Sequence, residues 1–235
     1  SDPTFYPNTH WLSVLWGSVL TQQNNFTVPG GTDKANYYVS FNYLNQENLL
    51  NSGGNSDFGF KRYNFRSNVD IKATNTTRIG FDISGYMGKA SNPGADYSYI
   101  FENINRAASV YAGKYANGLW GPAANNRNGW AAAYESGYRN DETDGLLTRL
   151  QISQDIPFVK GLSLKGVAAY DNKPTHNKTW LLPVKTYVAV QDNDNIRYDQ
   201  LTGMDKPSLI EYQGTGQNTL LELHAIYNRD FGNHG

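Results

Sequence analysis

The 235-residue sequence contains no cysteine. This absence excludes a disulfide framework, a thiolate metal site and a cysteine nucleophile. The formal net charge is only −1 and no long run of Lys or Arg occurs, so we expect no nucleic-acid-binding surface. Long apolar runs are missing as well, and the mean hydropathy is −0.61, which excludes a transmembrane helix. The hydropathy does not exclude a transmembrane β-barrel, because the strands of such a barrel are apolar on one face only.

Signatures of catalysis are also lacking. The sequence contains no Walker phosphate-binding loop, no GxGxxG and no GxSxG. Its four histidines lie far apart without an i,i+4 pair, so we expect no metal site. The run 192–195 has the spacing of a calcium loop, but Arg197 stands where that loop requires glycine. A hairpin turn is the favoured interpretation of this run, with a loose calcium site as the alternative. We predict no enzymatic activity and no cofactor.

Strand-like alternation is abundant. Aromatic residues make up 14% of the chain, led by 17 Tyr, and Gly occurs 23 times, a composition typical of strands joined by turns. Apolar and polar residues alternate with a period of two in several segments. The pattern predicts about seven strands, near 22–28, 35–44, 61–72, 77–87, 145–155, 161–171 and 218–229. Most of these are close to the 9–11 residues or so with which a tilted strand crosses a bilayer.

The connections between these strands alternate between short and long. The long ones are 45–60, 88–145 and 172–217, and those between them are tight turns. Outer-membrane barrels have short periplasmic turns and long extracellular loops. The sequence therefore predicts an all-β fold, specifically part of a large antiparallel transmembrane β-barrel. We treat residues 1–235 as one partial barrel domain.

The two faces of the strands have different chemistry. In a membrane barrel the apolar face meets lipid and the polar face lines the lumen. An Arg or Lys at mid-bilayer costs about 2–4 kcal/mol, so we expect four polar residues to face the lumen: Arg62, Asn64, Arg66 and Asp70. The residues expected to face lipid are Tyr37, Val39, Phe41, Tyr43, Tyr63, Phe65, Val69 and Ile71. The alternative is a half-exposed sheet of a soluble protein, with the apolar face as its core.

Aromatic residues concentrate in the longest loop, 88–145. Rings beside amide side chains can stack on and hydrogen-bond a sugar or a peptide. We therefore select Trp120, Asn125, Asn126, Trp130 and Tyr134 as candidate substrate or partner contacts. The alternative is that these rings only pack the loop. Residues 99–112 have helical spacing, and 5–20 suggest a short helix or an irregular loop.

Several runs resemble, in order, the SusC/RagA-type TonB-dependent outer-membrane transporters of Gram-negative bacteria. They are YPNTHW (6–11), NNFTVPGGTDKANYYVSFNYLNQE (24–47), FKRYNFRSNVDIKAT (60–74), DIPFVKGLSLKGVAAYD (155–171) and IYNRDFGNHG (226–235). Barrels of this family have about 22 strands around a plug. Nothing in this sequence resembles the plug domain or the TonB-contacting box. We therefore expect an internal barrel fragment of a longer transporter.

The resemblance implies active import of an oligosaccharide or an oligopeptide across the bacterial outer membrane. It implies energy from TonB, contacted through the missing N-terminal part, and a SusD-like surface lipoprotein as the lid. The barrel wall would contact outer-membrane lipid. Two alternatives stay open: a soluble or surface-attached β-protein that binds glycans through aromatic loops, and a passive porin-like channel.

Overall fold

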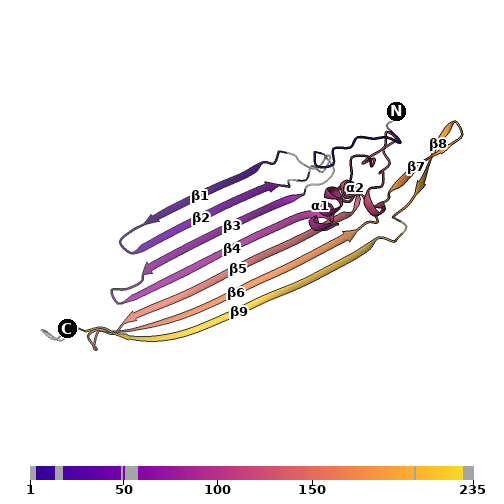
Figure 1. The fold of residues 1–235 in the computed structure, drawn as a ribbon. Helices are drawn as coiled ribbons and strands as arrows, with labels where there is room; N and C mark the ends of the chain where they lie inside the picture. The colour runs from indigo at the N-terminus through magenta and orange to yellow at the C-terminus, as the bar shows by residue number, and fades with distance from the viewer. Residues whose placement is uncertain (1–3, 14–17, 49, 51–57, 204, 230–235) are drawn as a thin grey trace.

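The computed structural model describes residues 4–13, 18–48, 50, 58–203 and 205–229. Seven strands form one antiparallel sheet in the order β1-β2-β3-β4-β5-β6-β9, and β7 and β8 form a separate hairpin (Figure 1). The sheet strands are β1 (Thr21–Gly31), β2 (Ala35–Glu47), β3 (Gly59–Lys72), β4 (Thr77–Pro93), β5 (Gly137–Asp155), β6 (Leu162–Leu181) and β9 (Ser208–Tyr227). The fold class predicted from the sequence is confirmed as all-β, and the sheet is open, with β1 and β9 at its edges.

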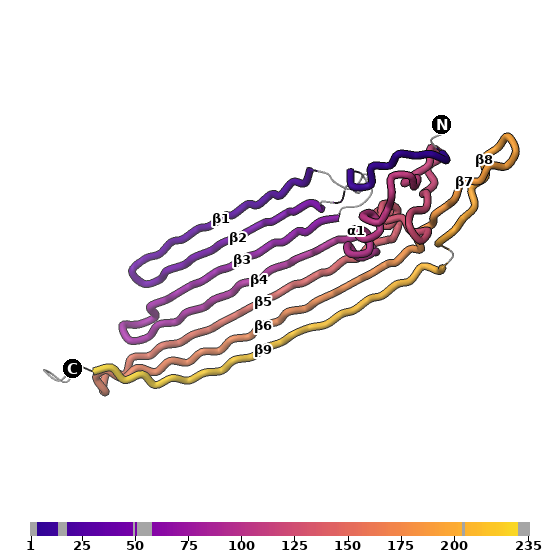
Figure 2. Tube along the Cα trace, in the orientation of Figure 1, coloured from indigo at the N-terminus to yellow at the C-terminus, as the bar shows by residue number. Residues whose placement is uncertain are grey.

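The short connections all lie at one end of the sheet, and the long ones lie at the other (Figure 2). In the β1–β2 turn, the Thr32 hydroxyl accepts hydrogen bonds from the backbone N–H groups of Lys34 and Ala35. The β3–β4 turn uses Thr74 in the same way, toward the N–H groups of Thr76 and Thr77. These side chains replace ladder partners where the strands reverse.

The strands are longer at the loop end than the alternation predicts. β4 continues to Pro93 and β5 begins at Gly137, so the expected loop 88–145 shrinks to 94–136. β6 continues to Leu181 and β9 begins at Ser208, so the expected loop 172–217 shrinks to 182–207. The expected bounds differ because these extensions are mostly polar and their few apolar residues do not alternate regularly, while backbone pairing continues.

Two helices, a 3-10 turn and a hairpin occupy the long connections. Residues 94–136 contain α1 (Tyr97–Asn105), the 3-10 turn η1 (Ala124–Asn126) and α2 (Gly129–Glu135). Residues 182–207 contain β7 (Tyr187–Asp192) and β8 (Asn195–Gln200). The helical spacing seen at 99–112 corresponds to α1, which ends at Asn105. The run 192–195 forms the β7–β8 turn, with Asn193 at φ 54°.

The N-terminal segment is irregular where it is described. Residues 4–13 and 18–20 contain turns and no helix, and residues 14–17 lie outside the described part. Trp11 is buried, and its indole N–H donates to the carbonyl of Ala108 at 3.1 Å. Of the two expectations for residues 5–20, the irregular loop fits these described residues. In the part of the chain that the structure describes, no helix is long and apolar enough to span a membrane.

Strand register aligns the apolar residues into a band on one face of the sheet. Side chains that are paired across strands lie on the same face. One row of pairs crosses six strands, through Tyr37, Val69, Phe81, Leu150, Ala168 and Leu221. The members of this row on β2, β4, β5 and β9 are large apolar residues that are each more than a third exposed. The buried hydrophobic cluster of the molecule lies elsewhere, around Ile100 and Ile104.

Candidate functional site

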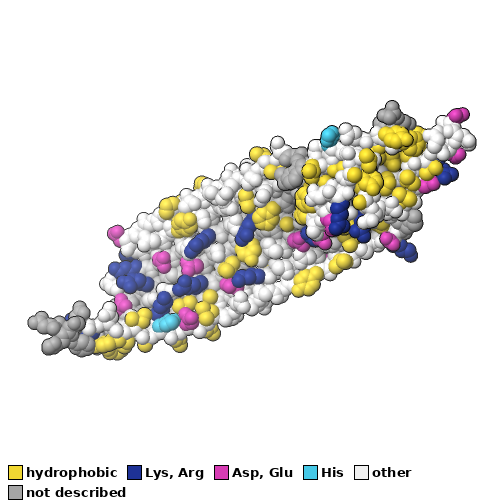
Figure 3. Space-filling view, in the orientation of Figure 1, with side chains coloured by type: hydrophobic (Ala, Val, Ile, Leu, Met, Phe, Trp, Pro, Cys, Tyr) yellow, Lys and Arg dark blue, Asp and Glu magenta, His cyan; other side chains and the backbone are white. Residues whose placement is uncertain are grey.

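We define the cap as residues 94–136 and 182–207, the long connections around α1, α2 and the β7–β8 hairpin. The cap lies over the charged face of the sheet at the loop end, where hydrophobic side chains gather beside the charged ones (Figure 3). Tyr97 of α1 donates to Asn92 of β4 at 2.9 Å, and Asp96 accepts from Arg139 of β5 at 2.7 Å. Burial raises the pKa of Tyr97, so its hydroxyl stays protonated at neutral pH and remains a donor.

Helix packing gives the cap its own small core. Ile100 is fully buried and Ile104 is 2% exposed. Gly129 at the start of α2 lies against them, because a Cβ there would meet the Ile100 carbonyl oxygen at 2.5 Å and the Ile104 side chain at 2.7 Å. Any larger residue at position 129 would force α1 and α2 apart. This core holds the loop in a defined shape.

Three of the five selected residues form one aromatic cluster. The rings of Trp120 and Trp130 meet edge to face at 5.3 Å, and Tyr134 lies 5.9 Å from Trp120. Trp120 is only 7% exposed, and its indole N–H donates to Glu135 at 3.3 Å. Lys114 lies over the Trp120 ring at 4.4 Å, a cation–π contact. The cluster therefore packs the loop, and Trp120 also lines a cavity.

Asn125 and Asn126 lie apart from that cluster, exposed on η1. Both have left-handed backbones, with φ of 57° and 60°, a conformation that asparagine tolerates better than most residues. Asn128 stabilises this turn from inside: its amide donates to the carbonyls of Gly113 and Gly121, each at 2.7 Å. Its carbonyl oxygen accepts from the N–H of Ala131 and so caps α2.

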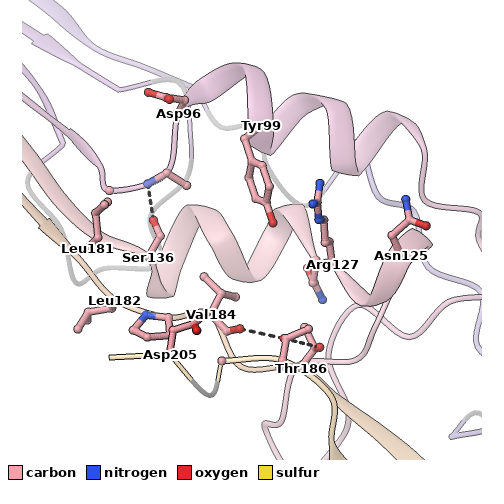
Figure 4. Close-up of a pocket in the computed structure, with 16 residues that line it drawn as sticks. Asp96, Tyr99, Asn125, Arg127, Ser136, Leu181, Leu182, Val184, Thr186 and Asp205 are labelled. Carbon is pink, nitrogen blue, oxygen red and sulfur yellow. Dashed lines mark hydrogen bonds between the residues drawn. The ribbon is translucent and has the colours of Figure 1, made fainter. Parts of the chain in front are cut away.

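The first cavity has a volume of about 530 Å³ and lies between the two long connections (Figure 4). Asn125 is on its wall together with the charged residues Asp96, Arg127 and Asp205. The Arg127 guanidinium lies 5.5 Å from the centre of the Tyr99 ring. The apolar part of the lining includes Leu181, Leu182, Pro183 and Val184. Such a site offers charges of both signs beside apolar surface.

The second cavity has a volume of about 590 Å³ and is lined by Trp120, Glu135, Lys185 and Tyr187, among others. It shares Leu182, Pro183, Gly203 and Asp205 with the first cavity. The segment at 182–183 therefore separates two adjoining pockets. Thr186 stabilises the junction, because its hydroxyl donates to the carbonyl of Asn126 at 2.8 Å and pairs with Thr202 at 2.7 Å.

Of the residues that line the two cavities, the sequence pointed to two, Asn125 and Trp120. Arg127 lies in the aromatic-rich loop 88–145 but carried no pattern of its own. Asp96 precedes the helical spacing of α1, which is a signal for a helix start. The contributions of 181–186 and of Asp205 come from the other long connection, and no local pattern brings them to Asn125. Among the described residues, no group of three or more His, Cys, Asp or Glu could hold a metal ion.

The four residues expected to line a lumen share the charged face of the sheet. Arg62 donates to Asn64 at 2.9 Å, and Asn64 donates to Asn42 on the neighbouring strand at 3.0 Å. Arg66 donates to Asn68 at 2.9 Å, and the Asp70 carboxylate lies close to Gly80 of β4. The eight residues expected to face lipid share the opposite face, as their cross-strand pairs indicate.

Comparisons with known proteins agree with the barrel section that this geometry indicates. No family model matches the chain. TonB-dependent receptor P3 of Formosa agariphila is 25% identical over 97% of this chain and 22% of its own length. TonB-dependent receptor P26 of the same organism is 32% identical over 84 residues, which are 36% of this chain and 8% of that protein. The chain is similar to part of a SusC/RagA-type TonB-dependent transporter.

Solved structures agree on the fold of this SusC/RagA-like chain. The RagAB peptide importer in its closed-closed state aligns with a TM-score of 0.55 and 14% identity, over 94% of this chain and 32% of that chain. The RagAB peptide transporter gives the same values. The resemblance inferred from the sequence is confirmed, and the open sheet matches a section of a transporter barrel. The chain spans about a fifth of the length of receptor P3 and about a third of the solved chains.

Proposed function

We propose that this chain forms part of the wall and the extracellular cap of a transporter for nutrient import across the bacterial outer membrane. TonB supplies the energy, and a SusD-like surface lipoprotein closes the extracellular side. The cargo is an oligosaccharide or an oligopeptide, and the protein binds and moves it without covalent chemistry. The longer protein that carries this chain performs the full cycle.

The apolar band is the observation that carries this proposal. On β2 it runs from Ala35 to Tyr43, and eight residue steps of about 3.3 Å at a tilt of roughly 40° span about 20 Å. That height is close to the apolar band of about 25 Å that outer-membrane barrels present to lipid. A water-exposed sheet would gain nothing by keeping Phe41, Phe65 and Phe81 each more than 40% exposed on one face.

The opposite face and the loops fit the same orientation. Arg62, Asn64, Arg66 and Asp70 then line the lumen, and the cap covers it on the extracellular side. The two adjoining cavities are the proposed cargo contacts, with Asn125, Arg127 and the edge of Trp120 on their walls. Asn126 supports the first cavity through Thr186, while Trp130 and Tyr134 hold Trp120 in place.

An exposed apolar patch shared by the cap and the N-terminal segment supports the lipoprotein partner. It joins the N-terminal segment to the loop after α1, where the N–H of Thr9 donates to the carbonyl of Ser109 at 2.9 Å. Tyr6 is 74% exposed and Val110 is 67% exposed. Leu12 and Tyr111 add further exposed apolar surface. Exposed apolar residues gathered in this way mark interaction sites on proteins.

The test uses the full-length protein that carries this chain, produced in a bacterium with an intact TonB system. We expect it in the outer-membrane fraction, in complex with a surface lipoprotein, and folded only in detergent or lipid. Uptake of labelled oligopeptides or oligosaccharides is measured with TonB present and deleted. Arg127→Ala should reduce that uptake, and Lys160→Ala in the opposite β5–β6 turn is the matched control.

Each alternative function predicts a different result. A soluble glycan-binding protein would be folded and monodisperse in plain buffer, which would contradict the membrane assignment. A passive channel would give the same uptake without TonB, which would contradict active import. Equal uptake by Arg127→Ala and Lys160→Ala would remove the first cavity from the cargo path.

A further inference from the structure

A polar hollow of about 500 Å³ lies at the loop end of β2–β5, apart from the cap cavities. Its side chains include Asn45, Glu47, Lys61, Lys89, Ser91 and Asn140. By strand register these six share the face that carries the apolar band, because Lys61 lies two residues before Tyr63 and Lys89 lies two residues after Met87. The hollow therefore opens outward from the barrel, one row beyond the end of the apolar band.

Two lysines meet directly across the strands in this hollow. Lys61 of β3 is the register partner of Lys89 of β4. Like charges placed opposite each other destabilise a sheet, so an arrangement of this kind is favourable when an anion lies between them. Lys89 has one carboxylate partner, Glu142, at 2.9 Å. Lys61 has no carboxylate partner among the residues that the structure describes.

The acidic side chain that lines the hollow, Glu47, already accepts a hydrogen bond from the backbone. Glu47 accepts a hydrogen bond from the backbone N–H of Leu20 at 3.1 Å, at the other margin of the hollow. Ser91 donates to Asn140 at 2.8 Å across the β4–β5 pair. Together with Asn45, these uncharged groups offer hydrogen bonds to hydroxyl groups, and the Lys61 ammonium is not held in an ion pair within the described part of the chain.

Below the lysines the same face is apolar on β3 and β4, whereas on β5 the register partner of Met87 is Asp144. Met87 is 58% exposed, Tyr63 is 40% exposed and Phe65 is 42% exposed. A hollow with two lysines and hydroxyl-binding groups directly above exposed apolar side chains complements an amphiphile with an anionic, hydroxylated headgroup. Lysines near the membrane surface attract anionic headgroups in this way, and their stems cover apolar surface while the ammonium stays outside.

We propose that this hollow binds the phosphate-bearing headgroup of an outer-leaflet lipid, with Lys61 and Lys89 on the phosphate and Tyr63, Phe65 and Met87 along its acyl chains. The inference rests on the proposed membrane orientation, in which the loop end faces outward. The site lies on the lipid side of the wall and is separate from the cargo path. A tightly held lipid there would fix the height of β2–β5 in the bilayer.

The experiment measures lipid binding to the full-length detergent-purified protein by native mass spectrometry. The probes are lipid A with both phosphates, the same lipid A after removal of its phosphates, and inorganic phosphate as a competitor. We expect the phosphorylated lipid to bind about tenfold tighter than the dephosphorylated one. The double variant Lys61→Gln/Lys89→Gln should abolish this preference.

Lys178→Gln is the matched control, because Lys178 lies on the same face of β6, opposite Glu211 in register, and should keep the preference. Lys61→Arg retains the charge and should also keep the preference, which separates loss of binding from loss of folding.

Equal binding of the two lipids, or equal loss of the preference in Lys178→Gln, would overturn the proposal. Displacement by inorganic phosphate as effectively as by lipid would assign the site to free phosphate instead. A protein folded in plain buffer would reject the membrane orientation itself, a separate result.

Discussion

Leu150→Arg tests directly whether the apolar face meets lipid. Leu150 lies on β5 in the middle of the apolar band, between Phe81 and Ala168 in register. Its side chain is 41% exposed, so a longer residue fits without repacking a protein core. If this face contacts hydrocarbon, the guanidinium enters the bilayer near its midplane. If the face contacts water, it stays solvated.

The two environments give different magnitudes. Arg on the lipid face near the midplane costs about 2–4 kcal/mol of folding free energy, which lowers the folding equilibrium constant roughly 30- to 800-fold. An exposed substitution in water changes stability by at most about 0.5 kcal/mol. The expected effect is therefore several times larger than the competing interpretation allows.

The assay is a urea titration of the full-length protein in lipid vesicles, with the folded fraction followed by heat-modifiable electrophoretic mobility. Gln151→Arg is the matched control, since Gln151 is the next residue, lies on the charged face and accepts from Arg149 at 2.9 Å. We expect a lower unfolding midpoint for Leu150→Arg than for Gln151→Arg. Equal midpoints would refute the assignment of the apolar face to lipid.

Three further predictions concern packing, the cap and pH. Gly85→Val should destabilise the sheet by about 1–3 kcal/mol, because a Cβ there meets the Phe65 ring at 2.3 Å; thermal unfolding in detergent measures this. Asn128→Ala leaves the carbonyls of Gly113 and Gly121 without its amide donor and should cost about 1–3 kcal/mol locally, seen as faster proteolysis within 94–136. His176 lies on β6 beyond the apolar band, and its pKa is raised chiefly by its hydrogen bond to the Glu211 carboxylate on β9. The first residues of β9 should therefore be best protected from hydrogen exchange below about pH 6.5, and this protection should fall as pH rises through the raised pKa.

Controls for these predictions come from the same chain. Gly216→Val should be nearly neutral, because no atom lies within 4 Å of the added Cβ. Asn117→Ala should leave proteolysis of the cap unchanged, since Asn117 is exposed and caps only a local turn through Leu119. His176→Asn should remove the pH dependence of β9 protection. A pH dependence that persists in His176→Asn would point to another titrating group.

The all-β class, the number of strands in the main sheet and the separation of short from long connections were readable in the sequence. The alternation in 60–72 has a period of two because successive side chains point to opposite faces, and this local rule needs no tertiary information. The Thr-rich turn at 73–77 was readable for the same reason, since Thr74 contacts only its own neighbours.

Strand ends and cavity walls depended on the tertiary structure. β6 runs on to Leu181 because β5 and β9 continue to offer backbone partners there, although no apolar alternation marks the extension. The cap cavities bring Asn125 beside Leu182 and Asp205 from a connection far along the chain. Such pairings are set by packing between distant segments, which local patterns do not encode.

The sequence by itself therefore determined which face of each strand is apolar, because that follows from the two-residue period of an extended chain. Only the tertiary structure decided how those faces join into one band, and that Lys61 stands opposite Lys89 beyond its end. Cross-strand register depends on turn geometry and on pairing along whole strands. A shift of one residue would move every side chain of a strand to the other face.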